Sequence, residues 1–381
     1  CEMVKKIAAV TFWFPTKEKP LSFPFIVEHL KAISKTQHLA FVLYIRVEQS
    51  QKLFAQSISK YDYEGLKIVE IFVKSKLHKL LYQFPLLLWP SIKKRIKTGN
   101  FDQIDVVHGM VVFPAGVLAY LIAKKINKPL VLTEHWSKTT KFLSSHLLSY
   151  LGRSAFNYAT KVTFVSKWLQ SEVCEVVPML AEKSVIVPNV VDSHLFHYAE
   201  KIYKPGMPIR FITVASSWNA DRDLYLIVNS LEQLVRQSGK SLELVIIGGG
   251  ILYDEIKTLK WSYPIIFGGF QTRQEIASHL NHAHYFLFSS KFETFSVVTA
   301  EALVTGTPVL VSDVAALPEL VKQGYGLTTP NTIEGWTAAL EKLIGTHFET
   351  DKIAAESSEY FNADKIAAAF EKVYENIQVI R

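Results

Sequence analysis

The sequence predicts an α/β protein built from two doubly wound domains, each with a parallel sheet. Three observations lead to this prediction. The chain has 381 residues, which is too long for one ordinary hydrophobic core and favours two domains. Short runs of β-branched and aromatic residues alternate with longer helical patterns. A polar stretch containing Pro and Gly interrupts this alternation near the middle, as a connection between domains does.

The first series of elements fills the N-terminal half. We expect strands at Ile7–Thr11, Ala40–Ile45, Leu66–Phe72, Val106–His108, Leu130–Thr133 and Lys161–Val165. Helical patterns lie between them at Phe25–Ser34 and Pro114–Ile126. Most of the strand candidates are continuous apolar runs, which is typical of strands buried on both faces of a parallel sheet.

The second series repeats the same alternation. We expect strands at Ile209–Val214, Leu242–Ile247, Ile265–Phe267, Tyr285–Phe288 and Pro308–Val311, and helices at Asp223–Ser238, Thr272–Leu280 and Val297–Thr305. A last helical pattern, Ala363–Val379, has no strand after it. Strand, helix and strand repeated twice over indicate two Rossmann-like domains.

These patterns predict the domain bounds. We expect an N-terminal domain at residues 1–190, a linker at 191–208, a C-terminal domain at 209–362 and a final helix at 363–381 that can pack back on the N-terminal domain. Two such sheets that face each other leave a central cleft between the carboxyl ends of their strands. Ligands bind there, at the point where the strand order reverses.

Composition excludes several classes of protein. Two cysteines, Cys1 and Cys174, are too few for a disulfide framework or a cysteine-based metal site, which predicts a reducing, cytoplasmic compartment. The start of the chain has no long apolar segment typical of a signal peptide, and no run of 18 apolar residues is present. No Walker motif and no Gly-x-Ser-x-Gly elbow occurs. We therefore expect no metal, no other cofactor and no nucleic-acid partner.

Charge is divided unevenly along the chain. Residues 1–200 contain 26 Lys and Arg against 15 Asp and Glu, whereas residues 201–381 contain 16 against 20. Two interpretations of the basic half stay open. Its lysines can be scattered over the solvated surface, or they can form a patch that binds an anionic partner. The segment His78–Lys97 presents the same choice, because apolar and aromatic residues lie beside a basic cluster there. A surface helix on anionic lipid would fit, but Pro85 and Pro90 interrupt a single long helix and favour a helix packed on its sheet.

The segment Phe286–Val311 is the richest in chemistry. It is expected to form a strand, a loop with Glu293, a helix that starts near Val297 behind the N-cap Ser296, and a further strand. A helix that begins at the carboxyl end of a strand offers amides and a positive dipole end to a pyrophosphate. Glu301, about one turn into that helix, can accept hydrogen bonds from ribose hydroxyls. Either glutamate taken alone is more often a solvated acid at a helix start. The evidence for a binding site therefore comes from the whole segment and not from one glutamate.

This segment resembles the signature of a known family. Glu293-Thr-Phe-Ser-Val-Val-Thr-Ala-Glu301 is similar to the Glu-x7-Glu motif of the retaining glycosyltransferases of family 4, which have the GT-B fold of two Rossmann-like domains. Other segments agree along nearly the full chain. They are Trp13-Phe-Pro15, Asp105-Val-Val-His108, Leu132-Thr-Glu-His135 and Val185-Ile-Val-Pro-Asn-Val-Val-Asp192.

The resemblance implies roles for particular residues. Glu301 would bind the ribose of a nucleoside-diphosphate sugar, and Glu293 would lie by the donor sugar. His135 would point at the donor sugar and the reaction centre, although a lone histidine at a strand end is otherwise more often structural. The remaining assignments concern backbone groups. The amides of Thr294, Phe295, Ser296 and Val297 would face the sugar and pyrophosphate, and the backbone of Phe270 would grip the base.

Two departures from the family pattern affect the diphosphate and the acceptor. The family has an arginine and a lysine after the first C-terminal strand, where this chain has Ser216 at the arginine position and Arg222 near the lysine position. One cation in place of two weakens stabilisation of the leaving group unless Arg222 compensates. The first loop contains Ser22-Phe23-Pro24 where the family prefers glycine.

The resemblance implies a retaining, metal-independent transfer of a sugar from a nucleoside-diphosphate sugar to a glycan or lipid-linked acceptor, with domain closure that excludes water. A peripheral contact of the basic N-terminal half with the inner face of the membrane would suit an anionic acceptor. Two alternatives remain. One is a GT-B nucleotide-sugar epimerase, and the other is a non-catalytic subunit that binds nucleotide sugars, which the missing arginine at Ser216 suggests.

Overall fold

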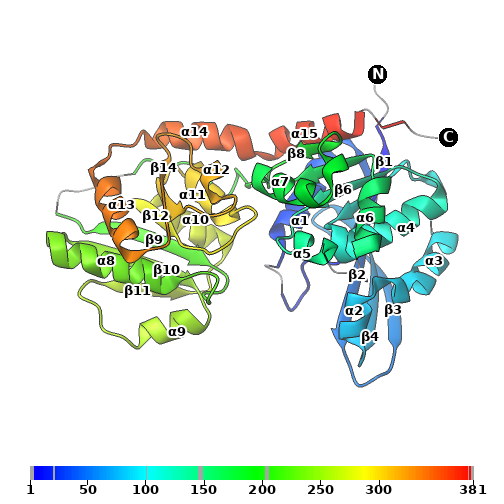
Figure 1. The fold of residues 1–381 in the computed structure, drawn as a ribbon, viewed down its shortest axis with the longest axis horizontal. Helices are drawn as coiled ribbons and strands as arrows, with labels where there is room; N and C mark the ends of the chain where they lie inside the picture. Colours follow the sequence, from blue (N-terminus) through cyan, green and yellow to red (C-terminus); the bar gives the residue numbers. More distant parts are fainter. Residues whose placement is uncertain are drawn as a thin grey trace. The chain divides into compact units, whose positions relative to one another are not determined.

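The computed structural model describes residues 4–19, 22–99, 101–144, 149–201, 206–375 and 377–378. These residues form two compact units. The first comprises residues 1–190 with 363–381, and the second comprises residues 191–362. Each unit is a largely parallel sheet covered by helices on both faces (Figure 1). The predicted class of two Rossmann-like α/β domains is confirmed.

The sheet of the first unit has eight strands in the order β3-β4-β2-β1-β5-β6-β7-β8. The parallel strands are β1 (Lys6–Thr11), β2 (His38–Gln49), β4 (Leu66–Ser75), β5 (Val106–Met110), β6 (Leu130–Glu134), β7 (Lys161–Phe164) and β8 (Ser184–Ile186). The strand order reverses between β1 and β5, so the carboxyl ends of these two strands frame the switch point of this sheet.

An antiparallel edge strand, β3 (Ala55–Tyr63), pairs with β4 along its whole length. It was not predicted, because its side chains are exposed from Gln56 to Asp62 and form no apolar run. The turn before β4 explains the hairpin. Glu64 and Gly65 both have positive φ angles, 52° and 83°, which is the backbone of a two-residue turn suited to twisted strands.

Helices cover both faces of the first sheet. The chain carries α1 (Pro24–Thr36), α2 (His78–Gln83), η1 (Pro85–Leu88), α3 (Trp89–Thr98), η2 (Phe101–Gln103), η3 (Val112–Gly116), α4 (Val117–Ile126), α5 (Thr139–Leu143), α6 (Ser149–Tyr158), α7 (Lys167–Val176), η4 (Pro178–Leu180) and α15 (Ala363–Glu375). The last helix packs against α1, and Phe370 and Tyr374 are buried with Ile33 and Val106 in one hydrophobic cluster. The predicted end of that helix at Val379 lies outside the described residues.

The second unit has the strand order β11-β10-β9-β12-β13-β14, with every pair parallel. Its strands are β9 (Ile209–Ala215), β10 (Leu242–Gly248), β11 (Ile265–Gly269), β12 (Tyr285–Phe288), β13 (Val309–Ser312) and β14 (Gly326–Thr329). This is the strand order of a dinucleotide-binding fold, and it places the switch point between β9 and β12. Ligands of such sheets bind outside the carboxyl ends of those two strands.

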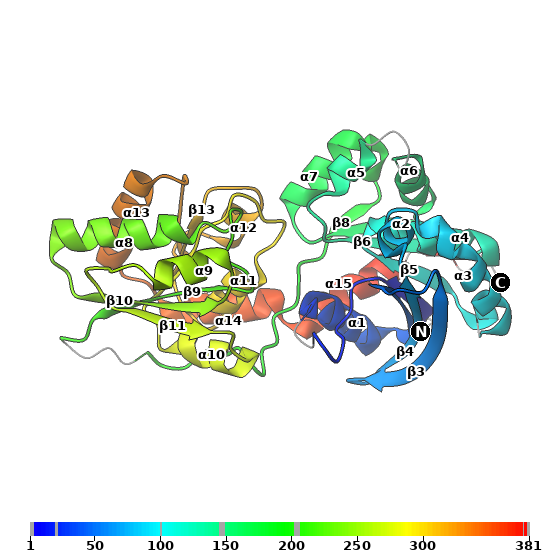
Figure 2. The same cartoon turned by 90° about the horizontal axis from the view of Figure 1, so that it is seen from below.

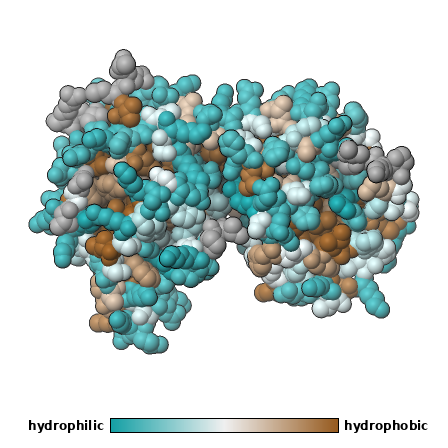
Figure 3. Space-filling model, turned by 180° about the vertical axis from the view of Figure 1, so that it is seen from behind, coloured by the Kyte–Doolittle hydropathy of each residue, from teal (hydrophilic) through white to brown (hydrophobic). Residues whose placement is uncertain are grey.

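The helices of this unit are α8 (Leu224–Ser238), α9 (Ile251–Lys257), α10 (Arg273–Asn281), α11 (Val297–Val304), α12 (Leu317–Leu320), α13 (Ile333–Gly345) and α14 (Thr350–Phe361). Helices α8 and α13 pack together on one face of the sheet, and α10, α11 and α14 lie on the other (Figure 2). Figure 3 shows hydrophilic side chains over most of the visible surface of each unit, with small hydrophobic patches between them.

The segment expected as a linker is packed on the second unit where it is described. Val191 and Phe196 are buried. The Lys201 ammonium donates hydrogen bonds to the carbonyl oxygens of Leu280 and Ala283, both at 3.0 Å. These bonds satisfy backbone carbonyls at the end of α10 and tie residues 191–201 to that helix.

Candidate active site

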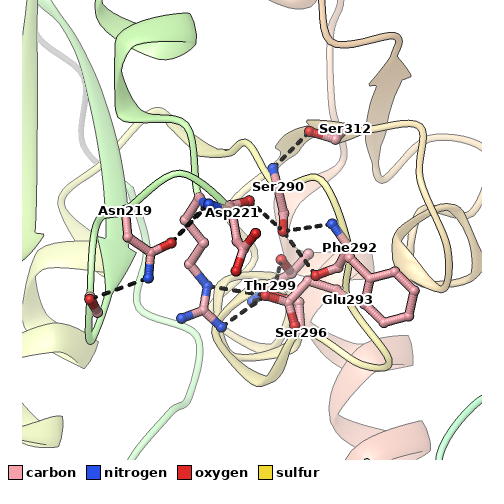
Figure 4. A network of polar contacts seen from close by, with 10 residues as sticks. Asn219, Asp221, Ser290, Phe292, Glu293, Ser296, Thr299 and Ser312 are labelled. Carbon is pink, nitrogen blue, oxygen red and sulfur yellow. Dashed lines mark hydrogen bonds and ion pairs between the residues drawn. The ribbon is translucent and has the colours of Figure 1, made fainter. Parts of the chain in front are cut away.

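The loops after β9 and β12 meet at the switch point of the second unit. Lys291 donates its backbone N–H to the carbonyl of Asp221 at 2.8 Å, and Ser289 donates its hydroxyl to the carbonyl of Asp223 at 2.6 Å. The sequence places these loops about seventy residues apart, and the parallel pairing of β9 with β12 brings them together. Figure 4 shows Asn219 and Asp221 on one side of this network and Glu293 on the other.

Glu293 pairs with Arg222 across the two loops. The guanidinium donates to Glu293 Oε1 from Nε at 3.1 Å and from Nη2 at 2.9 Å. The side chain of Glu293 is largely buried, and this burial raises the pKa of its carboxyl, while Arg222 opposes the rise. Ser216 is exposed directly after β9 and supplies no cation. Arg222 is therefore the cation that the structure brings to Glu293.

The loop that carries Glu293 is held at several backbone positions. Ser290 donates its N–H to the hydroxyl of Ser312 at 2.9 Å, and its own hydroxyl bridges the N–H and carbonyl of Phe292. The side-chain amide of Asn331 donates to the carbonyl of Ser290 at 2.8 Å. The bond from Ser290 to Ser312 joins the ends of β12 and β13 (Figure 4), and the bond from Asn331 joins the loop to the segment after β14.

Helix α11 begins directly after this loop, as predicted. The Ser296 hydroxyl accepts from the N–H of Thr299 at 3.3 Å and so caps the helix. The loop residues Thr294 and Phe295 lead into this cap, and Val297 is the first helical residue. Amides at such an end, together with the helix dipole, form a place where an anion is stabilised.

Glu301 lies on α11 with only 5% of its surface exposed. Burial raises the pKa of its carboxyl to about 7, and the nearby Arg273 opposes this rise. Nη2 of Arg273 donates to Glu301 Oε1 at 3.0 Å. Arg273 was not predicted from the sequence. The signal that could have found it is a cation at the start of a helix, an end where the dipole favours acidic residues.

Phe270 follows β11, and 74% of its surface is exposed. Its ring lies on Gly249 so closely that a Cβ on that glycine would be 2.8 Å from the ring. Gly248 and Gly250, on either side, have φ angles of 112° and 118°, which other residues rarely adopt. The glycine turn after β10 is therefore the surface on which Phe270 rests.

His135 lies in the first unit, directly after β6, and is 6% exposed. Its ring centroid is 5.0 Å from those of Phe25 and His29. Burial lowers its pKa well below the ordinary value, so the imidazole is neutral at pH 7. The other predicted site residues all belong to the second unit.

The residue before it, Glu134, was also missed. Its Oε1 accepts the N–H groups of His135 at 2.9 Å and Trp136 at 2.7 Å, and its Oε2 accepts the N–H of Val112 at 3.0 Å. One buried carboxylate thus joins the segments that follow β5 and β6. Burial raises its pKa to about 7 against the lowering effect of these N–H groups. A carboxylate at the end of a largely apolar strand is the signal that could have pointed to it.

A metal centre is not formed by protein groups in the described ranges, since no three His, Cys, Asp or Glu side chains gather there as ligands.

Comparisons with known proteins identify the family to which this chain belongs. A model described as Glycosyltransferase Family 4 matches residues 51–195, and one described as Glycosyl transferases group 1 matches residues 208–346. Together the two matches span more than half of the chain. The fold and the site define a glycosyltransferase of the GT-B class. The chain belongs to glycosyltransferase family 4.

Relatives and solved structures support the assignment to the glycosyltransferases. An uncharacterized glycosyltransferase of Methanocaldococcus jannaschii is 26% identical over 292 residues, which are 72% of this chain and 76% of that protein. The N-acetyl-alpha-D-glucosaminyl L-malate synthase of Bacillus anthracis is 22% identical over 314 residues, 78% of this chain and 81% of the relative. The crystal structure of HepE from Anabaena in complex with UDP matches with a TM-score of 0.71 at 16% identity, covering 98% of this chain and 100% of that one.

Proposed function

We propose that this glycosyltransferase moves a sugar from a nucleoside-diphosphate sugar to a glycan or lipid-linked acceptor, with retention of anomeric configuration and without a metal ion. The observation that carries the proposal is the arrangement at the switch point of the second unit. There, Glu293 in the loop at residues 289–296 pairs with Arg222, and the buried Glu301 on the capped helix that follows pairs with Arg273.

Each part of the nucleoside-diphosphate sugar finds a group of suitable chemistry at this site. Glu301 accepts hydrogen bonds from the ribose hydroxyls, which its ionised carboxylate is suited to do. The amides of residues 294–297 and the positive end of α11 face the sugar and the diphosphate. The backbone near the exposed Phe270 holds the base. HepE was solved with UDP, so UDP is the first nucleotide to test.

The leaving diphosphate needs positive charge in place of a metal. Arg222 supplies one cation next to Glu293, and the amides of α11 supply partial charges that are fixed in advance. Ser216 adds none, so we expect slower turnover than an enzyme with two cations at this place. His135, neutral because it is buried, serves the donor sugar and the reaction centre as a hydrogen-bonding group.

We propose further that the acceptor is reached at the cytoplasmic face of a membrane. No helix in the described ranges has both the length and the apolar character of a membrane span, so the contact would be peripheral. From Lys74 to Lys97 the chain has seven Lys and Arg and no acid. In this segment Leu81, Leu88, Ile92 and Ile96 are buried, while Leu77, Leu80, Leu86 and Leu87 are exposed. Exposed leucines among lysines suit an anionic lipid surface.

The donor assignment is tested by the substitution Glu301→Ala. We expect the dissociation constant of UDP in calorimetry to rise roughly 10- to 100-fold, because hydrogen bonds to a charged group are lost. Glu341→Ala, an exposed glutamate on α13, is the matched control and should bind as the wild type does. Unchanged binding by the Glu301 variant would show that the donor site lies elsewhere.

The reaction itself is tested with a panel of nucleotide sugars and candidate acceptors, with and without EDTA. Release of free nucleotide with a product of the donor's anomeric configuration, read by NMR, is expected in both conditions. Loss of activity with EDTA would refute the metal-independent step. A new sugar epimer would identify an epimerase, and binding without turnover would identify a regulatory subunit.

The membrane contact is tested by sedimentation with vesicles. Binding is expected to phosphatidylglycerol vesicles at low salt, to weaken as salt is added, and to be absent with phosphatidylcholine. Replacing Leu86 and Leu87 with serine should reduce binding, while Leu259→Ser, an exposed leucine of the second unit, should not. Equal binding of all variants would contradict the proposed contact.

A further inference from the structure

Arg273 occupies a position that the stability of its own helix does not explain. It is the first residue of α10, directly after the N-cap Thr272, which forms a capping box with Glu275. The amino end of a helix carries partial positive charge, so a cation is disfavoured there. The capping box satisfies the backbone N–H groups of Thr272 and Glu275 without the arginine. A contact outside the helix must therefore account for the arginine.

The guanidinium is fixed between two buried groups. One nitrogen donates to Glu301 at 3.0 Å, and Cζ lies 5.2 Å from the ring centroid of Phe196. Phe196 is completely buried, and the side chain of Glu301 is only 6% exposed. A planar guanidinium that stacks on a ring and donates to a carboxylate loses little freedom when it binds. The carboxylate thus meets a cation whose place is set by the protein.

The cation favours the ionised form of Glu301. Burial raises its pKa, and Asp192, from the segment that also carries Phe196, raises it further, while Arg273 lowers it. A carboxyl that takes up a proton becomes a hydrogen-bond donor and loses acceptor capacity, whereas a carboxylate has about four acceptor sites. One hydrogen bond to Arg273 leaves capacity for two ribose hydroxyls.

We propose that Arg273 is a positioning residue for the donor site, which holds Glu301 ionised and correctly oriented for the ribose of the nucleoside diphosphate. The inference rests on the proposed role of Glu301. Arg273 does not touch the nucleotide in this proposal, so it acts through the carboxylate alone. Phe196 fixes the guanidinium, which links the packed segment at residues 191–201 to the donor site.

The test measures nucleotide affinity between pH 6 and pH 9 in calorimetry, with whichever of UDP, GDP and ADP the wild type binds most tightly. Arg273→Gln should weaken binding roughly 10-fold or more at pH 7.5, where Glu301 of the wild type is above its pKa of about 7 and the variant carboxyl takes up a proton. The deficit relative to wild type should shrink as the pH is raised to 9, where Glu301 ionises without help. Arg273→Lys should restore much of the affinity at pH 7.5. The control Arg236→Gln removes an exposed arginine of the same unit and should follow the wild type at every pH.

Several outcomes would overturn the inference. Unchanged affinity in Arg273→Gln would do so, as would a deficit that is the same at every pH and is not reduced by Arg273→Lys, since this pattern indicates a merely structural role. The variant Glu301→Gln separates this failure from that of the proposed function. If Glu301→Gln loses the nucleotide while Arg273→Gln shows no dependence on pH, only the role of Arg273 is wrong. If Glu301→Gln binds normally, the donor site itself is wrong.

Discussion

Each glutamate of the Glu-x7-Glu segment meets an arginine that the segment does not contain. Arg222 follows β9 and Arg273 begins α10. A buried carboxylate without a cation costs free energy and gains a proton instead. The arginines oppose the rise in pKa that burial causes in Glu293 and Glu301, and so favour the carboxylate form that accepts hydrogen bonds. The motif gives the place of the carboxylates, and arginines from two other segments stabilise their negative charge.

At the residue scale, Glu134 gives a prediction for the first unit. Its carboxylate accepts N–H groups of His135, Trp136 and Val112. In Glu134→Gln the new amide NH2 must face at least one of these donors, which leaves a buried N–H unsatisfied. We expect a loss of about 1–3 kcal/mol in the free energy of unfolding of the first unit, measured by hydrogen exchange of β5 and β6. Turnover should fall as well, because His135 loses its anchor.

Glu175→Gln is the matched control for this substitution, since Glu175 is an exposed residue of α7 in the same unit. It should change neither hydrogen exchange nor turnover. If Glu134→Gln proves as stable and as active as this control, the carboxylate does not anchor the His135 segment.

At the element scale, the apolar runs predicted the buried parallel strands well, because burial on both faces leaves a continuous signal. The same reasoning failed for β3, whose exposed residues carry no such signal. The hairpin that contains β3 is specified by its turn instead, because Glu64 and Gly65 adopt positive φ there. The helix after β12 was predicted with its N-cap Ser296 because a capping residue is a local feature.

The candidate site could be predicted only in part, and the reason is also physical. Local sequence placed Glu293, Ser296 and Glu301 on one strand–loop–helix segment. It could not show that Arg222 turns toward Glu293 or that Arg273 reaches Glu301, since both contacts join segments distant in the chain. The sequence shows that Ser216 is no cation, but the contact of Arg222 with Glu293 depends on the pairing of β9 with β12.

At the scale of the whole molecule, the chain leaves the first unit and returns to it. Residues 363–381 belong to the same unit as residues 1–190. The helix α15 buries Phe370 and Tyr374 beside α1, and the Tyr374 hydroxyl lies 2.6 Å from Nδ1 of His108. The amphipathic pattern of residues 363–379 predicted a helix, but its partner depends on tertiary contacts. The C-terminal helix thus completes the core of the unit that contains His135.

That core contains three buried histidines, which makes the first unit sensitive to acid. Burial lowers the pKa of His29 to about 4 and of His108 to about 3, and that of His135 lies well below the ordinary value. The unfolded chain takes up these protons as the pH falls below about 6.5, and the folded unit does not. Stability is therefore full above pH 6.5 and is lost as the pH falls toward 4. The raised pKa of Glu134 has the opposite effect on stability as the pH falls. The three histidines outweigh this single carboxyl.

The variant His29→Gln isolates one part of this effect. Its side chain can still donate to the carbonyl of Pro188, as His29 Nε2 does at 2.8 Å, but it does not titrate. Between pH 7.5 and pH 5.5 the wild type should lose about 1.4 kcal/mol more unfolding free energy than this variant, because one histidine is protonated only in the unfolded chain. Hydrogen exchange of the β1 and β5 peptides, corrected for the intrinsic effect of pH, measures the difference. His38→Gln, an exposed histidine of the same unit, should lose as much stability as the wild type, and equal losses in all three proteins would refute the acid sensitivity assigned to His29.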